Sequence, residues 1–270
     1  MTEYLCATCG TQYPEQKPDT GLPPSHCPIC EDERQYVPET GQKWVTSSDL
    51  KAHHHIRRER HSEKLHSLII EPRAAIGQRA FFIETSYGNV LWDCLSILDQ
   101  PTIDWINSRG ELTAIAISHP HYYTAMGNWS DIFDKIPIYL NQNDAQWVQK
   151  SHPAIHHWTG NSLSINPDIT LVKCGGHFAG GTVLHWREAK GYLFTGDIIQ
   201  VVADQKHVSF MYSYPNYIPL SARKVTNIGH SIEPYDFETV HGAFEGRTID
   251  TDGKQAVKYS VNRYLQALEA

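Results

Sequence analysis

Five residues of the kind that bind metal ions each follow a short apolar or glycine-rich run in this chain. They are His119, His121, His177, Asp197 and His241. The apolar residues 114–117 predict a buried strand that leads directly into the first two histidines. Because side chains two residues apart in an extended strand point the same way, we expect His119 and His121 to turn toward one cation.

The other three residues are also expected at strand ends. Predicted strands precede each of them, at residues 169–174 before His177, 192–195 before Asp197 and 237–240 before His241. Glycines on both sides of His177 allow a sharp turn and a close approach of the backbone to a site. Three imidazoles with a neighbouring carboxylate are the ligands expected of a catalytic zinc with an open position. We therefore predict a site formed by His119, His121 and His177, with Asp197 adjacent.

The order of these segments resembles the metallo-β-lactamase-fold hydrolases, which include β-lactamases, glyoxalase II thioesterases and lactonases. The resemblance covers about residues 66–245. Residues 81–93 resemble the opening hairpin of that family, with Asp93 in the place of its buried aspartate beneath the metals. The resemblance implies an α/β fold, a four-layer αββα sandwich, and a metal-dependent hydrolase.

One motif departs from the family pattern. The family usually has His-x-His-x-Asp-His, whereas this chain has Tyr123 in place of the aspartate and Thr124 in place of the last histidine. Both missing groups normally hold the second metal, so that site would keep only Asp197 and His241. We expect one tightly bound zinc, and a second ion weakly held or absent unless the phenol of Tyr123 is recruited as a ligand.

The N-terminal segment carries an independent metal-binding pattern. Two C-x-x-C motifs supply the four thiols of Cys6, Cys9, Cys27 and Cys30. Four thiolates at this spacing suit a tetrahedral ion, and we expect structural zinc. Gly10, Tyr13 and Pro28 resemble rubredoxin, although Glu31 replaces its glycine after the last cysteine, so iron is the alternative occupant. Two disulfides are a third interpretation.

Composition divides the chain into two predicted domains. Residues 1–40 have few aliphatic side chains and form a four-cysteine ribbon, of the zinc-ribbon or rubredoxin-like kind, that is too small to fold without its metal. Residues 41–270 would form the metallo-β-lactamase-fold domain. Helices are predicted there at residues 102–109, 128–134, 143–150, 219–229 and 253–270.

Other reactive side chains are given structural interpretations. The stretch of histidines and arginines at residues 53–66 follows a capping sequence at Thr46 and is predicted to continue a polar, solvated helix. Cys94 and Cys174 adjoin apolar strands and are predicted to be buried small hydrophobic residues rather than nucleophiles.

The net charge of −7 and the pI of about 6.1 argue against a nucleic-acid partner, although residues 51–64 form a local basic stretch. No apolar run has the length of a membrane-spanning helix, and the first residues do not resemble a signal peptide. We expect a cytoplasmic protein without a membrane partner, acting on a small molecule. The oligomeric state is left open.

The predicted mechanism is metal-assisted hydrolysis of an ester, lactone, thioester or amide. A cation would activate bound water, and Asp197 would orient that water and shuttle its proton. His241 and Tyr123 are candidates to stabilise the oxyanion or to protonate the leaving group. The aromatic residues 210–217 could form a substrate wall, together with Tyr122, Tyr123, His207 and Phe178, or simply pack in the core.

Two other classes of function stay open. The first is a non-catalytic metal-binding or ligand-binding module in which Tyr123 plugs the second metal site. The second is an iron-dependent oxidoreductase in which the rubredoxin-like centre feeds a non-haem iron.

Overall fold

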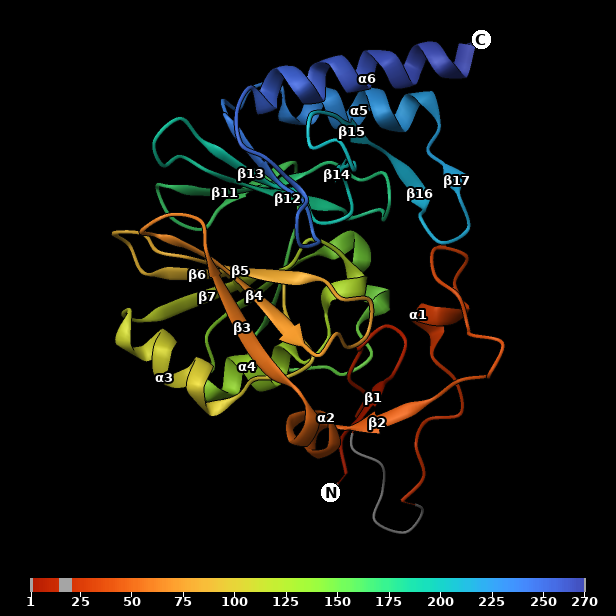
Figure 1. Ribbon diagram of the computed structural model, residues 1–270, viewed down its shortest axis with the longest axis vertical. Helices are drawn as coiled ribbons and strands as arrows, with labels where there is room; N and C mark the ends of the chain where they lie inside the picture. The colour runs from red at the N-terminus through yellow and green to blue at the C-terminus, as the bar shows by residue number, and fades with distance from the viewer. Residues whose placement is uncertain (1, 15–20, 270) are drawn as a thin grey trace. The chain divides into compact units, whose positions relative to one another are not determined.

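The computed structural model describes residues 2–14 and 21–269. The chain forms two compact units, the first made of residues 1–140 and 146–156 and the second of residues 141–145 and 157–270. Figure 1 shows a β-sheet and flanking helices in each unit. Within the described residues, every helix is too short or too polar to cross a membrane.

The first unit is organised around a seven-stranded sheet with the order β3-β4-β5-β6-β7-β8-β9. Its strands are β3 (His55–Arg60), β4 (Leu65–Glu71), β5 (Arg79–Ile83), β6 (Asn89–Trp92), β7 (Leu112–Ala116), β8 (Ile138–Asn141) and β9 (Ile155–Trp158). The strands β3 to β6 pair antiparallel, whereas β6, β7 and β8 run parallel. Every residue of β5 and β6 is buried, and the sequence of each strand is apolar after its first residue, Arg79 or Asn89.

Helices connect the strands of the first unit. They are α2 (Ser47–His53), α3 (Gln100–Ser108), α4 (Met126–Ile132) and the 3₁₀ segment η1 (Pro120–Tyr122), while a second 3₁₀ segment, η2 (Gln142–Trp147), follows β8. Parallel strands require a crossover, and α3 provides it between β6 and β7. The helices predicted at residues 102–109 and 128–134 are confirmed with shifted ends, whereas the one predicted at residues 143–150 is the shorter 3₁₀ segment η2.

The prediction of a helix through the histidine-rich stretch was wrong. The Thr46 hydroxyl caps α2 as predicted, accepting a hydrogen bond from the Asp49 amide, but that helix ends at His53. Residues 55–60 form β3, which pairs along its whole length with the buried strand β4. The ladder of hydrogen bonds to β4 outweighs the local helical preference of this polar sequence.

The four-cysteine ribbon (residues 1–40) lies in the first unit. It contains β1 (Tyr4–Cys6) and the one-turn helix α1 (Pro28–Glu31). Strand β1 pairs antiparallel with β2 (Trp44–Thr46), so hydrogen bonding continues past residue 40. The domain boundary at residues 40 and 41 stays a prediction.

The second unit contains a six-stranded sheet with the order β10-β11-β12-β13-β18-β19. Its strands are β10 (Ser162–Ser164), β11 (Ile169–Lys173), β12 (Thr182–Trp186), β13 (Tyr192–Phe194), β18 (Thr239–His241) and β19 (Thr248–Ile249). Two small hairpins complete the unit, made of β14 (Gln200–Val201) with β15 (Val208–Ser209) and of β16 (Met211–Ser213) with β17 (Ile218–Pro219).

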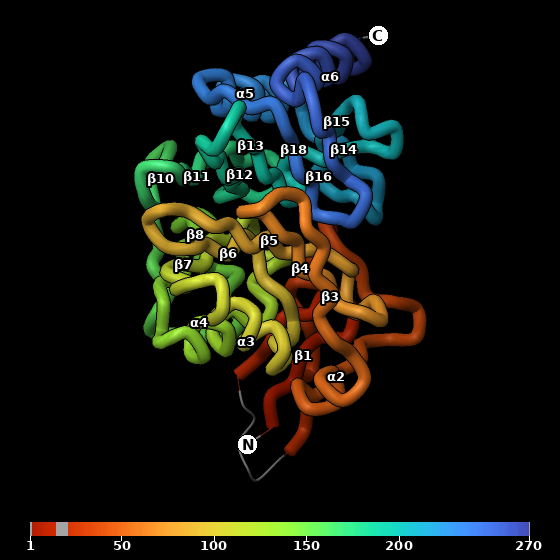
Figure 2. The backbone as a smooth tube through the Cα atoms, turned by 60° about the vertical axis from the view of Figure 1, so that its left-hand side comes forward, coloured from red at the N-terminus to blue at the C-terminus, as the bar shows by residue number. Residues whose placement is uncertain are grey.

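Two helices pack side by side in the second unit, as both Figure 1 and Figure 2 show. They are α5 (Ala222–Ile232) and α6 (Gly253–Glu269), close to the predicted ranges 219–229 and 253–270. The first prediction began too early because Pro219 belongs to β17. Val225, Ile228 and Val257 carry the apolar faces of these helices into one core with strand residues such as Leu193 and Val240.

The Asp99 carboxylate ties α3 to β3. Its two oxygens accept hydrogen bonds from the backbone amides of Thr102 at 3.0 Å and of Ile56 at 2.8 Å. We predict that Asp99→Ala lowers the free energy of unfolding by about 2 kcal/mol, since it removes a helix cap and leaves a second amide without its acceptor. Thr46→Ala, which removes only the cap of α2, should cost about 1 kcal/mol. Urea unfolding of the two variants measures both values, and equal losses would contradict the double role of Asp99.

Candidate metal centres

The first two predicted ligands follow β7 in the first unit. The Asp93 amide donates to the Ala116 carbonyl at 2.8 Å, and its carboxylate accepts from the Ser118 amide at 2.8 Å. Asp93 is buried, as predicted from its place at the end of the opening hairpin. Two hydrogen bonds from one residue therefore fix the chain immediately before His119.

His119 and His121 come together, but not by strand alternation. His119 is extended, with φ −169° and ψ 172°, whereas His121 lies inside η1, the 3₁₀ turn that begins at Pro120. The prediction of extended chain through His121 was therefore wrong. The ligand nitrogens of the two buried rings still lie within 4.8 Å of each other, and a hydrogen bond of 2.9 Å joins His119 Nδ1 to the Ser118 hydroxyl. The tight turn brings the imidazoles to one place.

His177 lies in the second unit on the glycine turn after β11. Gly175 and Gly176 both have positive φ, and a Cβ on Gly176 would come within 2.8 Å of Ile228 of α5. The His177 Nδ1 donates to the carbonyl oxygen of Met211 at 3.2 Å. Because a carbonyl oxygen only accepts, the proton is on Nδ1 and the lone pair of the neutral ring is on Nε2. His177 thus has the tautomer that a metal ligand needs.

Asp197 and His241 follow neighbouring parallel strands of the same sheet. Strand β13 pairs with β18, so that Phe194 stands opposite His241 and the two rings stack at 5.2 Å. The carboxylate of Asp197 and a ring nitrogen of His177 lie within 4.8 Å of each other, while His241 is outside that group. A hydrogen bond of 3.0 Å joins His241 Nδ1 to the Thr248 hydroxyl. The second unit therefore pairs His177 with Asp197 and fixes the ring of His241 separately.

Tyr123 and Thr124 occupy the place where the sequence departs from the family motif. Tyr123 is buried and follows η1 directly, in the helical region of φ and ψ. Thr124 has a left-handed φ of 28°, which is unfavourable for a β-branched residue.

The aromatic residues predicted to form a substrate wall divide into different environments. Phe210 is fully buried in the apolar core, and Tyr217 is 83% exposed. Tyr214 contacts two predicted ligands, since its ring centroid is 5.7 Å from that of His177 and its hydroxyl donates to the Asp197 carbonyl at 3.0 Å. Burial and the nearby charge of Asp197 raise the pKa of Tyr214, so this phenol stays protonated as a donor.

Besides the buried Tyr123, three other residues were predicted to contribute to that wall. Phe178 and Tyr122 are buried, with ring centroids 5.1 Å from His177 and 4.5 Å from His119 respectively. His207 instead forms an ion pair of 2.6 Å with Asp204. Only the first two therefore pack against predicted metal ligands.

The four thiols of the four-cysteine ribbon converge as predicted. Their sulfur atoms all lie within 4.8 Å of one another, with 3.5 Å between Cys6 and Cys30 and 3.6 Å between Cys9 and Cys27. A tetrahedral zinc site with bonds of about 2.3 Å places its sulfurs about 3.8 Å apart, whereas a disulfide bond is about 2.05 Å. All six cysteines of the chain are free thiols, so the disulfide interpretation was wrong.

The chemistry of this cluster suits a cation. Burial and the three neighbouring sulfurs raise the pKa of Cys9 well above its ordinary range. Four thiolates can share so small a buried volume only when a positive ion neutralises them. The Tyr13 hydroxyl also donates to Cys27 Sγ at 3.0 Å, and Gln42 Nε2 donates to Cys6 Sγ at 3.2 Å. Such hydrogen bonds support ligating thiolates.

Cys94 and Cys174 are buried outside the four-cysteine ribbon, as predicted. Burial raises the pKa of each thiol to about 12. A thiol with such a pKa carries almost no thiolate at neutral pH. Neither is therefore suited to act as a nucleophile.

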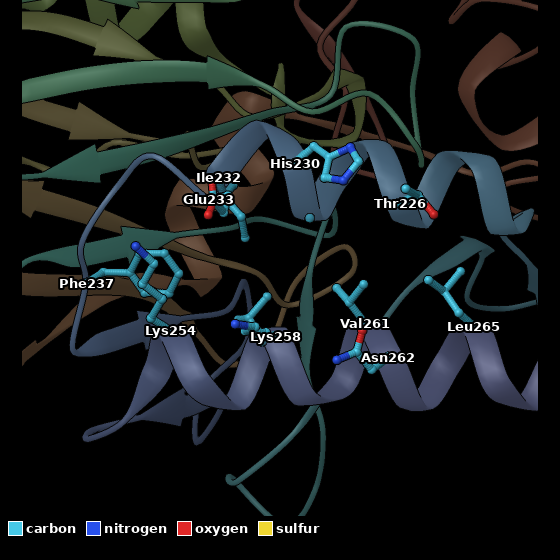
Figure 3. A pocket seen from close by; sticks show the side chains of 12 residues that line it. Thr226, His230, Ile232, Glu233, Phe237, Lys254, Lys258, Val261, Asn262 and Leu265 are labelled. Carbon is cyan, nitrogen blue, oxygen red and sulfur yellow. The ribbon is translucent and has the colours of Figure 1, made fainter.

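A cavity away from the predicted ligands lies between α5 and α6 in the second unit. It has a volume of about 280 Å³. Figure 3 shows Val261 and Leu265 pointing from α6 toward α5, with Lys254 and Lys258 along the same helix. None of the predicted site residues lines it. This cavity is a gap between packed amphipathic helices and does not coincide with the metal-ligand chemistry.

Sequence reasoning found the ligand-type residues but missed the groups that orient them. The carbonyl of Met211 and the hydroxyls of Ser118 and Thr248 each contact the Nδ1 of a histidine. Ser118 was detectable as the neighbour of His119. A backbone carbonyl far along the chain carries no sequence signal.

Comparison with known proteins places the chain in a family and identifies its fold. No protein-family model matches it. It is 44% identical over 275 residues to the uncharacterized protein YmaE of Bacillus subtilis strain 168, with 100% of this chain and 98% of YmaE covered. It is 30% identical over 105 residues to a hydroxyacylglutathione hydrolase of Bdellovibrio bacteriovorus, covering 37% of this chain and 39% of that protein.

Solved structures give the fold. The metallo-β-lactamase DIM-1 aligns with a TM-score of 0.59 and 18% identity, covering 78% of this chain and 98% of its own. FIM-1 from Pseudomonas aeruginosa, a metallo-β-lactamase solved in a mono-zinc form, aligns with a TM-score of 0.57 and 14% identity, covering 78% and 96%. These matches confirm the predicted metallo-β-lactamase fold class.

Asp93 offers a test of how the first histidine is positioned. Its φ of 60° suits glycine and asparagine, so Asp93→Gly keeps the conformation and removes the acceptor, while Asp93→Asn keeps both. We predict that Asp93→Gly lowers the free energy of unfolding by about 1–3 kcal/mol because the Ser118 amide is left buried without its acceptor. Asp93→Asn should lose less than half of that. Chemical denaturation measures the free energy of unfolding of both variants. Equal losses would show that the Ser118 hydrogen bond does not hold this turn.

Proposed function

Because this chain belongs to the same family as YmaE of Bacillus subtilis and has the metallo-β-lactamase fold, we propose that it is a metal-dependent hydrolase. Its substrate would be a small ester, lactone, thioester or amide. The observation that carries the proposal is the hydrogen bond between His177 Nδ1 and the Met211 carbonyl, because it directs the Nε2 lone pair to a ligand.

The donor set fits a single catalytic zinc. We assign the ligands as His119, His121 and His177, with Asp197 adjacent, on the motif order in the sequence and on the two close pairs that the units form separately. Imidazole nitrogen and carboxylate oxygen are the ordinary ligands of such an ion. When bound, the ion would lower the pKa of its water toward about 7 and polarise a carbonyl group.

The other groups of the chain supply proton transfer and orientation. Asp197 would orient the attacking water and accept its proton, and the Tyr214 hydroxyl donates to the backbone carbonyl of Asp197, which holds that residue in place. Tyr123 and His241 are the proposed donors to the developing oxyanion or the leaving group. Nonspecific water is excluded from these groups by their burial, since Tyr123 and His241 are only 3% and 2% exposed.

The substrate class rests on the comparison with the hydroxyacylglutathione hydrolase, which acts by its name on an acylated glutathione. We infer a small acyl compound as the substrate. We further propose a cytoplasmic location, because six free thiols suit a reducing compartment. The four-cysteine ribbon would hold structural zinc.

A second candidate function has one specific observation in its favour. Tyr123 and Thr124 replace the two ligands that the family motif uses for a second metal, and both are buried. A protein that binds metal without turnover would retain the three histidines and lose those groups. Hydrolysis of activated esters or thioesters by the zinc-loaded protein distinguishes the two functions.

We predict two tightly bound metal ions per chain, one in the four-cysteine ribbon and one at the histidines. Elemental analysis of native protein should return a stoichiometry of two. His177→Ala should release one ion and abolish hydrolysis, while His230→Ala, a histidine outside the proposed ligand set, should retain both. Three tightly bound ions in the wild type would overturn the single-zinc site, and iron in place of zinc would favour the oxidoreductase.

The departure from the family motif gives a further prediction. Tyr123→Asp combined with Thr124→His restores a carboxylate and an imidazole of the kind that hold a second cation, so the double variant should gain one metal ion per chain. Hydrolysis of generic esters should rise with it. The expected result is a stoichiometry of three by elemental analysis. A folded double variant that still binds two ions would show that these positions do not correspond to the family ligands.

A further inference from the structure

A loop of the four-cysteine ribbon contacts the segment that follows His121. The Gln12 amide donates to the Thr124 carbonyl at 3.2 Å. The neighbouring hydrogen bonds of the ribbon loop run from Cys6 N to Thr11 O and from Tyr13 N to Tyr4 O, whereas the Gln12 amide points out of the ribbon. This hydrogen bond joins the first pair of cysteines to the histidine segment.

Two further contacts hold the ribbon in the same position. The Ser96 hydroxyl donates to the Gly10 carbonyl at 3.1 Å, and a Cβ on Gly10 would come within 2.3 Å of that hydroxyl oxygen. The Glu3 carboxylate accepts hydrogen bonds from Lys150 at 2.8 Å and from Asn128 of α4 at 2.9 Å. Burial alone would raise the pKa of Glu3, but these hydrogen bonds outweigh it and lower the pKa. The ribbon is thus also held through Gly10 and through Glu3.

The ribbon loop and the histidine segment border one small cavity of about 10 Å³, at the lower limit for one water molecule. Its walls include Thr11, Gln12, Tyr123, Thr124 and Met126. Because the Gln12–Thr124 hydrogen bond and this shared wall bring the two segments together, a shift of the ribbon loop would reach Tyr123 and Thr124.

Thr124 needs such external support. A non-glycine residue held in a sparsely populated backbone region costs about 1–3 kcal/mol and persists only where its surroundings impose the conformation. The φ of 28° at Thr124 is imposed three residues after His121, and the Gln12 amide holds its carbonyl. The ribbon can hold Thr124 in this conformation only when the small core around its cysteines is ordered. That core consists of the four cysteines with Tyr13, Ile29, Trp44 and Trp147.

We propose that metal binding in the four-cysteine ribbon controls the histidine site, because the metal-ordered ribbon loop holds Thr124 and thereby the His119–His121 pair in its ligand conformation. The proposal rests on the proposed function, since it requires that the pair binds a metal. Loss of the ribbon metal, by chelation, then weakens metal binding at the histidines. The ribbon acts as a metal-dependent positioning device.

Two glycines provide a matched test. Gly10 and Gly41 have nearly equal left-handed φ values of 78° and 80°, so alanine costs each a similar backbone strain. A Cβ on Gly10 strikes Ser96, whereas one on Gly41 meets no atom of the described chain within 4 Å. Gly10→Ala should therefore weaken metal affinity at the histidines by about ten- to hundredfold, the range seen when supporting groups are lost, and Gly41→Ala should leave it unchanged.

The readout is the zinc affinity of the histidine site in competition with a chelator. Thiolate-to-cobalt charge-transfer absorption of cobalt-loaded protein reports separately whether the four-cysteine ribbon is occupied. Cys27→Ser, which removes a ribbon ligand, should weaken the histidine site by a similar factor. In a Thr124→Gly background the effect of Gly10→Ala should shrink severalfold, since glycine adopts the left-handed conformation without support.

The outcomes separate this proposal from the function on which it rests. A wild-type protein that binds no metal at the histidines would overturn both. A wild type that binds two ions, with unchanged histidine affinity in Gly10→Ala and in Cys27→Ser, would overturn the control by the ribbon and leave the hydrolase standing. Equal losses in Gly10→Ala and Gly41→Ala would assign the effect to backbone strain and would likewise overturn it.

Discussion

The hydrogen bond at Nδ1 determines which nitrogen a histidine offers to a cation, and the rest of this structure serves to place that bond. At His177 the partner is a carbonyl, which fixes the tautomer completely. At His119 and His241 the partners are hydroxyls, which fix the ring but can donate or accept. The glycine turn, the parallel pairing of β13 with β18 and the buried Asp93 all bring these rings to their partners.

The sequence was sufficient to predict which residues carry the chemistry and which strands precede them. Ligand-type residues at the ends of apolar runs are visible without a structure, because burial leaves a continuous hydrophobic sequence. The 3₁₀ turn at Pro120 was not predictable from that pattern, since it replaces an extended conformation only after the last strand residue. Strand β3 was missed for a different reason, because its polar sequence is held by pairing with β4 rather than by local preference.

The backbone groups that orient residues of the site could not be predicted from the sequence. Met211 contributes its backbone carbonyl to His177 from 34 positions farther along the chain, and any residue type at position 211 would supply the same oxygen. The contact between Gln12 and Thr124 is likewise made by backbone atoms. Interactions that do not depend on side-chain identity leave no residue pattern, and only the folded chain reveals them.

The same contact gives a physical interpretation of the departure from the family motif. A carboxylate and an imidazole at positions 123 and 124 would be held in place by a second cation. In this chain Tyr123 and Thr124 instead pack against the four-cysteine ribbon, and the Gln12 amide holds the left-handed Thr124. An ion bound at these positions would order the segment directly. Under the proposal the ribbon contact orders it instead, and the ribbon is itself ordered by its own metal. Under this proposal the ribbon and the altered motif act together, because the Gln12 amide holds the Thr124 backbone that lacks the ligands of a second ion.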